Sequence, residues 1–266
     1  MSSCDKFVRT REAWHQYNHE MQLFEVQKIL DSFLANLPAP KILEAGCGSA
    51  SHYQFKPGLE LVGIDISQEQ LDRNKTLSKK ILGDIQTYDL SKFNFDVIIC
   101  RFVLEHLDDP EKALANFVRG LSHRGIIVLV APNLFSLAGV VTKFTPFWFH
   151  RFATRILFPN KRMDATHNEL FPTPFRLSAT PRQVMLFAKR NGLKVRYFHI
   201  YEARFTWLLR RKSKLATVLF RALQVLVKVF TLGKLDILQS RYTMVLERNS
   251  QVRHTEYMET STQPVP

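Results

Sequence analysis

Cysteine is scarce in this chain of 266 residues, which contains only Cys4, Cys47 and Cys100. An odd number excludes a framework in which every cysteine forms an intramolecular disulfide. The three residues also lie too far apart in the sequence for the close Cys spacing of a structural zinc site. We therefore expect reduced thiols, no bound metal and a cytoplasmic location.

Long apolar runs are missing as well. The start, Met1–Lys6, has no apolar stretch, so we expect no signal peptide. The most apolar long segment, at about 207–232, carries a charge at almost every turn, which excludes a membrane-spanning helix. Residues 249–266 lack a hydrophobic pattern and are predicted to form a disordered tail.

Acidic residues are rare in one half of the chain. Residues 134–248 contain 21 Lys and Arg against 5 Asp and Glu, whereas the whole protein has a net charge of +13. The first half is therefore close to neutral, and the basic character belongs to the region that follows it. A basic surface of this kind suits anionic lipid headgroups, nucleic acid or an acidic substrate, although solvated basic faces without a partner are also common.

Short apolar strands alternate with helical segments, which predicts an α/β fold with a doubly wound, mostly parallel Rossmann-like sheet and helices on both faces. A helix over Gln68–Ser78 is expected after the second strand, and a basic, apolar helical region is appended to the sheet. The predicted regions are a helical cap (1–40), a nucleotide-binding core (41–133), an apolar and aromatic insertion that covers the substrate (134–180), the closing strands with an inserted helix at about 207–232 (181–248), and the tail (249–266).

A glycine-rich turn follows the first predicted strand, in the sequence Glu-Ala-Gly-Cys-Gly that begins at Glu44. A second strand ends in a carboxylate at Asp65. Strand, glycine turn and acid form the start of a nucleotide-binding βαβ unit. Ser51 stands where a dinucleotide-binding loop prefers a third glycine, and few residues separate the two strands, so the first crossover helix can have about two turns at most.

Four acidic residues come at or just after the ends of the first four strands: Glu44, Asp65, Asp84 and Glu105. The carboxyl ends of parallel strands form the ligand-binding edge of such a sheet. Acids there repel a pyrophosphate and favour a cationic ligand with hydroxyl groups, which S-adenosylmethionine provides. The alternative is that some of these acids only cap helices.

These segments follow one another in the order and spacing of a known family. Glu-Ala-Gly-Cys-Gly-Ser at 44–49, Gly-Ile-Asp-Ile-Ser at 63–67, Gly83-Asp84 and Phe-Val-Leu-Glu-His-Leu-Asp-Asp-Pro at 102–110 resemble the class I S-adenosylmethionine-dependent methyltransferases. The likeness is strongest to the type 11 group, which includes quinone-ring methyltransferases, and it spans about residues 40–133. Ala50, where glycine is common, and the short first crossover depart from the family pattern.

The resemblance implies which residues contact S-adenosylmethionine: Glu44, Gly46, Cys47, Gly48, Asp65, Ile66, Asp84, Ile85, Arg101 and Phe102. By the same likeness, the two glycines pass beneath the amino-acid part of the cofactor and Asp65 holds the ribose hydroxyls. Asp84 and Ile85 meet the adenine. Arg101 and Phe102 line the cofactor through their backbone.

Transfer of a methyl group to a hydroxyl is helped by a base. His106, which follows the fourth strand, is the first candidate for a catalytic base, and His150 and His167 are second choices. The alternative for His106 is a helix residue that only packs and contacts solvent.

The segment around 207–232 predicts an amphipathic helix with one narrow polar stripe and an unusually wide apolar face. That face needs a cover: the edge of the sheet beside the substrate, a second copy of the chain in a homodimer, or an anionic membrane surface. The apolar helix favours an apolar acceptor, and the residues leave oxygen, nitrogen and carbon open as the acceptor atom. We expect an enzyme that methylates oxygen on a small or lipid-like acceptor and that associates peripherally with the inner face of a membrane. A nucleic-acid methyltransferase and a non-catalytic scaffold with the same fold are the alternatives.

Overall fold

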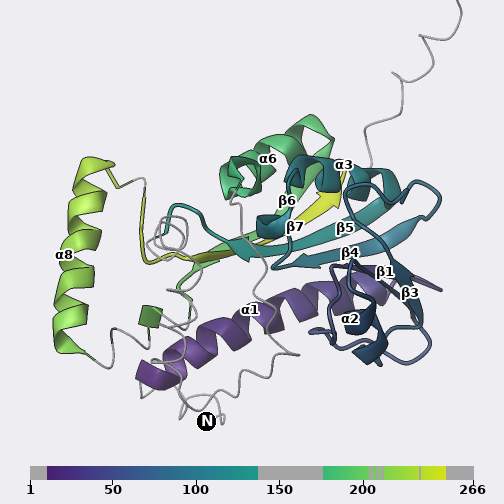
Figure 1. Ribbon diagram of the computed structural model, residues 1–266, viewed down its shortest axis with the longest axis horizontal. Coiled ribbons are helices and arrows are strands. Elements are labelled where there is room, and N and C mark those ends of the chain that lie inside the picture. The colour runs from purple at the N-terminus through teal and green to yellow at the C-terminus, as the bar shows by residue number, and fades with distance from the viewer. Residues whose placement is uncertain are drawn as a thin grey trace, which may run out of the picture.

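The computed structural model describes residues 11–136, 176–203, 206–207, 210, 213–233 and 235–249. These residues form a seven-stranded sheet with the strand order β3-β2-β1-β4-β5-β7-β6 (Figure 1). The predicted fold class, a mostly parallel sheet with helices on both faces, is confirmed. The strands are Lys41–Ala45 (β1), Glu60–Asp65 (β2), Lys79–Leu82 (β3), Phe95–Arg101 (β4), Leu121–Pro132 (β5), Leu193–Tyr201 (β6) and Arg241–Arg248 (β7).

The direction of the strands determines which residues meet at each edge of the sheet. Strands β1 to β5 pair in parallel, so their carboxyl ends lie at one edge. Strand β7 runs antiparallel to both β5 and β6, and its first residue, Arg241, pairs with Pro132 and Tyr201. The beginning of β7 therefore lies at the same edge as the ends of the parallel strands.

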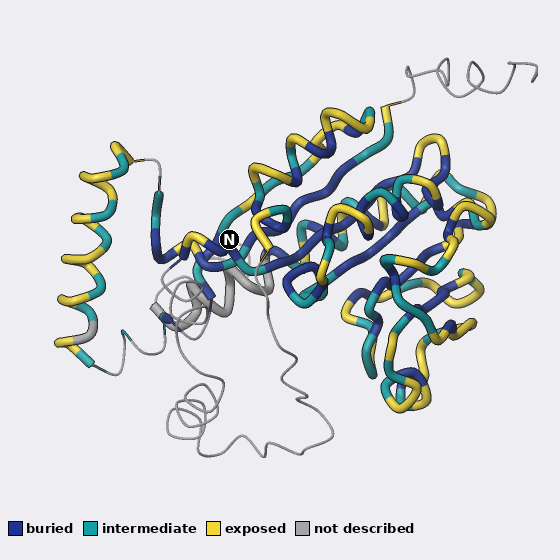
Figure 2. The backbone as a smooth tube through the Cα atoms, turned by 45° about the horizontal axis from the view of Figure 1, so that its top comes forward, coloured by how far each residue is buried: buried dark blue, intermediate teal, exposed yellow. Residues whose placement is uncertain are grey.

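Helices cover both faces of the sheet because neighbouring strand residues alternate between two apolar cores (Figures 1 and 2). On one face, Val26 and Leu30 of α1 (Arg11–Leu34) are buried in the core that contains Val97. On the other face, Phe117 of α3 (Pro110–Gly120) and Phe187 of α6 (Pro181–Arg190) are buried in the core that contains Ile98.

The connection between β1 and β2 contains no helix, in agreement with the expected short crossover. The next helix, α2, spans Gln68–Arg73, so the predicted helix over Gln68–Ser78 is wrong in its second half. Asn74 ends it: this fully buried side chain donates to the backbone oxygens of Cys47 and Gly48 at 3.5 and 3.2 Å. The residues after α2 are thereby joined to the glycine turn instead of continuing the helix.

The long helix predicted at about 207–232 is α8, which spans Lys214–Phe230. It begins later than predicted, and Thr217 N donates to Ser213 O at 3.0 Å in its first turn. It ends where Leu232 and Gly233 adopt positive φ angles of 51° and 77°, and Gly233 N donates back to Lys228 O at 2.7 Å.

Several sequence predictions lie outside the described residues: positions 137–175 of the insertion, all but Asn249 of the predicted tail, and the second-choice bases His150 and His167. Among the residues that the structure describes, no helix is both long and apolar enough to cross a membrane. The predicted division of the chain into regions stays a prediction.

Candidate cofactor site

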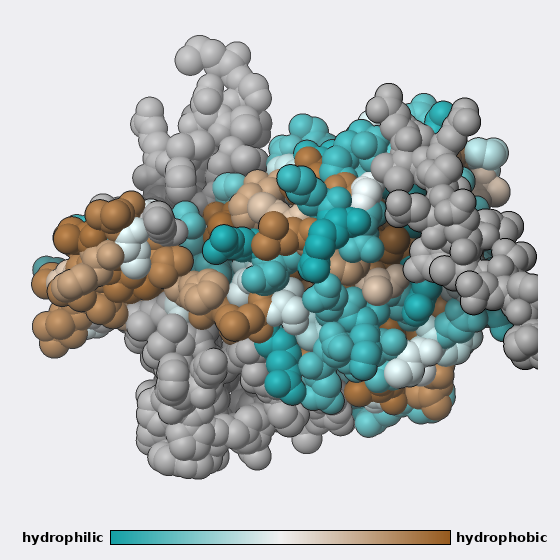
Figure 3. Space-filling model, turned by 90° about the horizontal axis from the view of Figure 1, so that it is seen from above, coloured by the Kyte–Doolittle hydropathy of each residue, from teal (hydrophilic) through white to brown (hydrophobic). Residues whose placement is uncertain are grey.

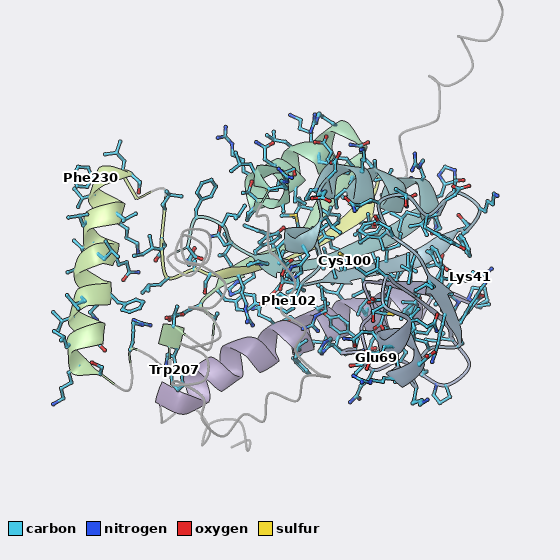
Figure 4. The ribbon with its side chains drawn as sticks, in the orientation of Figure 1. Lys41, Glu69, Cys100, Phe102, Trp207 and Phe230 are labelled. Atoms are coloured by element: carbon cyan, nitrogen blue, oxygen red, sulfur yellow. The ribbon has the colours of Figure 1, made fainter. Side chains whose placement is uncertain are left out.

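The predicted cofactor residues meet at the carboxyl edge of the parallel strands. Glu44 in β1 pairs with Gly63 in β2 and with Ile99 in β4, while Asp65 at the end of β2 pairs with Leu82 in β3. Phe102 directly follows β4, and the labels of Cys100 and Phe102 in Figure 4 mark the middle of this edge. Residues far apart in the sequence are thus brought to one edge, as a ligand site in this fold requires.

The glycine turn after β1 is fixed by backbone hydrogen bonds and by backbone conformation. The backbone nitrogens of Gly46 and Cys47 donate to Ile64 O at 2.8 and 3.2 Å. Gly46 and Gly48 have positive φ angles of 68° and 54°, a conformation that other residues adopt only with strain. A Cβ atom at Gly46 would lie 2.3 Å from Val103 Cγ2, whereas one at Gly48 would meet nothing within 4 Å.

This difference predicts unequal effects of two alanine substitutions. Gly46→Ala adds steric overlap to backbone strain and is expected to lower the free energy of unfolding by roughly 2–4 kcal/mol. Gly48→Ala adds only the strain and should cost about 1–2 kcal/mol. Chemical denaturation of both variants measures the two losses, and Val103→Ala should restore part of the stability of Gly46→Ala. Equal losses for the two glycine variants would contradict the close packing at Gly46.

The Asp65 carboxylate connects the glycine turn to the end of β2. Gly48 N donates to Asp65 Oδ2 at 2.8 Å, and Ser67 N donates to Asp65 Oδ1 at 2.9 Å. An ionised carboxylate offers about four lone-pair sites, so each oxygen keeps one for a further donor. Two free sites on a half-buried, fixed carboxylate suit the two vicinal hydroxyls of a ribose.

Glu44 is buried beside the glycine turn, and its burial raises the pKa of its carboxyl group. Ser51 Oγ donates to Glu44 Oε2 at 2.5 Å, and this hydrogen bond and the nearby charge of Arg101 partly oppose the effect of burial on that pKa. A buried carboxylate is stabilised further by a cation. Glu44 therefore fits the ammonium group of a bound amino acid.

Ile66, Ile85 and Asp84, three other predicted cofactor residues, differ in which of their atoms a ligand could contact. Ile66 follows Asp65 and is 65% exposed, so its side chain offers an apolar surface at the edge of the site. The side chain of Ile85 is buried in the core, so only its backbone is available to a ligand. Both oxygens of Asp84 accept from Gln86 Nε2, at 3.1 and 3.0 Å. The predicted contact of Asp84 and Ile85 with an adenine stays a prediction.

Neither of the two buried cysteines is a reactive thiol. Burial, together with the negative charges of Asp65 and Glu44, raises the pKa of Cys47 to about 12. The pKa of Cys100 is also raised, by its complete burial and by Glu105. Among the described residues, no group of three or more His, Cys, Asp or Glu is arranged to hold a metal ion. Cys47 can therefore contribute its backbone and its size to the site, and not a thiolate.

Sequence reasoning placed Arg101 and Phe102 at this edge through their backbone, and it missed the cluster that their side chains form with two other residues. We call this the arginine cluster: Tyr53, Arg101, Phe102 and Arg241. The Arg101 guanidinium carbon lies 5.3 Å from the centre of the Tyr53 ring and 5.7 Å from that of Phe102. The Arg241 guanidinium carbon lies 4.9 Å from the Phe102 ring. Nε and Nη1 of Arg101 are buried without a hydrogen-bond partner in the protein. These orphaned donors are available to an acceptor group of a ligand.

No motif could have identified Arg241, because only the antiparallel pairing of β7 brings it to this edge. Burial lowers the pKa of its guanidinium, and Tyr201 and Glu105 oppose that effect.

Phe102 has a positive φ of 53°, which is unusual for a residue other than glycine. Strained backbone of this kind is concentrated at functional sites. The site thus combines carboxylates with two cations, and is not uniformly acidic as the sequence suggested.

Glu105 and His106 occupy the short helix η2 (Leu104–His106) after β4. Glu105 is only 6% exposed, and its Oε2 atom is buried without a hydrogen-bond partner in the protein. Burial raises its pKa from the usual 4.5 to about 8, against the opposing effect of Arg241. His106 is half-buried, and its backbone nitrogen donates to Val103 O at 2.9 Å.

The pKa of Glu105 predicts how stability depends on pH. Between pH 4.5 and 8 the folded state keeps a proton that the unfolded state has lost, so the free energy of unfolding falls as the pH rises. Glu105→Gln carries no titrating proton, so the free energy of unfolding of this variant should depend less on pH. At pH 9 it should exceed that of the wild type by roughly 1–3 kcal/mol. Thermal unfolding at several pH values measures this difference. Glu111→Gln on the surface of α3 is the matched control, and equal pH profiles for all three proteins would contradict the assignment.

Comparison with known proteins agrees with this geometry. The family model described as "Methyltransferase domain" matches residues 43–129. The ubiquinone biosynthesis O-methyltransferase of Pasteurella multocida is 26% identical over 153 residues, which are 48% of this chain and 63% of that protein. A tRNA U34 carboxymethyltransferase of Campylobacter jejuni is 31% identical over 124 residues, which are 41% of each protein. The chain spans about half the length of the curated relatives it matches.

One solved structure shows how far the fold extends. The magnesium protoporphyrin IX methyltransferase from Synechocystis PCC 6803, crystallised with bound SAH, superposes with a TM-score of 0.50. The sequence identity is 14%, and the superposition covers 94% of this chain and 88% of that one. At this identity the likeness concerns the fold alone.

The strand order, the glycine turn and the acid after β2 match the Rossmann-like fold of the class I S-adenosylmethionine-dependent methyltransferases. Within this fold, residues 43–129 match the methyltransferase domain. S-adenosylmethionine is the cofactor of the class, and the free lone pairs of Asp65 and the buried carboxylate of Glu44 fit its ribose and its ammonium group.

Proposed function

We propose that the protein transfers a methyl group from S-adenosylmethionine to an oxygen atom of a small or lipid-like apolar acceptor. The observation that carries the first half of this proposal is the arrangement of Asp65, Gly48 and Glu44 at one edge of the sheet. The bound cofactor would supply an activated methyl group. The contribution of this chain is to hold the acceptor in line with that methyl group and to exclude water.

His106 is the proposed base for the acceptor hydroxyl. His106 is the last residue of η2, which follows the carboxyl end of β4. Its imidazole would take the proton that the hydroxyl loses as the new oxygen–carbon bond forms. Glu105 is a less suitable base, since its side chain is only 6% exposed.

The arginine cluster supports an acceptor that is partly aromatic and carries an oxygen. Two guanidinium groups beside the Phe102 ring offer donors to a phenolate, carbonyl or carboxylate oxygen, and the ring offers a flat apolar contact. The similarity to the ubiquinone biosynthesis O-methyltransferase of Pasteurella multocida supports the same class of acceptor.

The test uses the full-length protein with radiolabelled S-adenosylmethionine and four acceptors: an apolar phenol with a prenyl tail, the matching aniline, the matching benzoate and unmodified tRNA. The proposal expects label in the phenol ether, and loss of that label with Asp65→Ala. Transfer only to nitrogen or to tRNA would contradict it. No transfer to any acceptor, with no binding of S-adenosylhomocysteine by calorimetry, would favour a non-catalytic scaffold.

A nucleic-acid substrate is the second candidate. The excess of Lys and Arg in residues 134–248 and the similarity to the tRNA U34 carboxymethyltransferase of Campylobacter jejuni favour it. A tRNA complex should weaken steeply with salt, since each phosphate contact releases counterions. Weak tRNA binding with a shallow salt dependence would rule this substrate out.

A further inference from the structure

Helix α8 lies apart from the sheet, at one end of the molecule (Figures 1 and 2). It belongs to a segment inserted between β6 and β7, and the base of this segment is closed by backbone bonding: Ser240 N donates to Tyr201 O at 3.0 Å. A second bond, from Ala203 N to Ser240 Oγ at 2.8 Å, completes the closure. The insertion therefore leaves the sheet at the carboxyl edge, where Arg241 and the cofactor residues lie.

The polar side of α8 is the side that contacts the rest of the protein. Gln224 Nε2 donates to both oxygens of Asp236, at 2.8 and 3.0 Å. Lys228 Nζ lies 2.9 Å from Asp236 Oδ2, and Thr217 Oγ1 donates to Arg210 O at 2.5 Å. Polar groups that usually face water are thus used to hold the helix in place.

The apolar side of α8 points away from the protein. The exposed fractions of its apolar side chains include 69% for Leu215 and 81% for Phe230. The other exposed apolar residues of the helix are Val218, Leu219, Leu223, Val225, Leu226 and Val229. Figure 3 shows these hydrophobic side chains gathered over α8. The orientation is the reverse of a helix that packs on a core. The described part of the helix therefore does not use the edge of the sheet, one of the three covers considered for its apolar face.

An exposed apolar face of this length marks an interaction site. The charges on α8 indicate the partner: Lys214–Phe230 contains no acidic residue, and besides Lys228, which pairs with Asp236, it carries Lys214 and Arg221. Arg221 is exposed and lines a shallow hollow together with Val218, Ala222 and Val225. A second copy placed on this face would bring like charges together, whereas an anionic headgroup would pair with Arg221 as the apolar side chains enter the acyl region.

We propose that α8 binds the interface of an anionic lipid bilayer and lies in its plane. A helix of this length extends for about 25 Å, and the apolar side chains along one side allow it to lie flat. Because the insertion leaves the sheet beside Arg241, this orientation brings the carboxyl edge close to the bilayer. This proposal does not depend on the identity of the methyl acceptor. A lipid-like acceptor, however, would reach the site directly from the bilayer.

The test is co-sedimentation of the full-length protein with vesicles of phosphatidylcholine alone, or of phosphatidylcholine with phosphatidylglycerol. The wild type should bind the mixed vesicles, and more weakly at high salt. Leu219→Glu with Leu226→Glu should lower the partition coefficient by at least about tenfold, because both side chains would enter the bilayer. Leu177→Glu with Leu186→Glu, two exposed leucines outside α8 with the same change of charge, should bind like the wild type.

Calorimetric binding of S-adenosylhomocysteine should be unchanged in both double variants, which would show that they fold. A loss of vesicle binding would then concern α8 alone and not the proposed methyl transfer. Equal binding of the wild type and the α8 variant to the mixed vesicles would overturn the proposal. So would the absence of binding by the wild type. A concentration-dependent dimer that the α8 substitutions dissociate, without vesicle binding, would assign the face to a second copy.

Discussion

Asp65→Ala is expected to weaken the binding of S-adenosylhomocysteine by about 10- to 100-fold, which corresponds to roughly 1–3 kcal/mol. The carboxylate would accept hydrogen bonds from the ribose hydroxyls with the lone pairs that Gly48 N and Ser67 N leave free. Its removal also takes away the acceptor that fixes the glycine turn. Isothermal titration calorimetry of the full-length protein measures the effect.

Asp72→Ala is the matched control for this loss. Asp72 lies on α2, close in sequence to Asp65, and its side chain accepts from Gln68 Nε2 on the surface. This variant should bind S-adenosylhomocysteine like the wild type. If Asp65→Ala also binds normally while remaining folded, the ribose is held by another group and the assignment of Asp65 is wrong.

His106→Ala is expected to lower kcat by about 100-fold while KM for S-adenosylmethionine stays close to its wild-type value. General-base catalysis typically contributes 10²–10⁴ to the rate, and removal of the base loses most of it. Steady-state kinetics with the phenol acceptor measures kcat and KM.

The control for His106 is His123→Ala. His123 is exposed near the start of β5, at the opposite edge of the sheet, and should not change kcat. A His106→Ala variant with full activity would mean that the base is another group, or that the acceptor needs none. If the loss of kcat came with a lower melting temperature, His106 would have a structural role.

The sequence predicted correctly those parts of the fold that depend on residues close together in the chain. The continuous apolar runs of β4 and β5 and the glycine turn before Asp65 predicted the parallel sheet and its ligand edge. These signals are local: an apolar strand, a turn that needs positive φ and an acid follow directly from nearby residues. The short crossover before β2 was also predictable, from the small number of residues between the two strands.

Long-range contacts explain what the sequence could not predict. Helix α2 ends at Arg73 because the Asn74 side chain donates to the backbone oxygens of Cys47 and Gly48 in the glycine turn. These partners lie 27 and 26 positions before Asn74 in the sequence. Arg241 reaches the site only through the pairing of β7 with β5 and β6. The amphipathic pattern of α8 predicted a covered face, but it could not indicate that the polar side holds the helix and the apolar side points outward.

The account depends on a cofactor that lies along the carboxyl edge between β1, β2 and β4. A crystal structure of the protein with S-adenosylhomocysteine tests this most directly. We expect both ribose hydroxyls within hydrogen-bond distance of Asp65 and the amino group close to Glu44. A ligand bound elsewhere, or a ribose held by residues other than Asp65, would contradict the account.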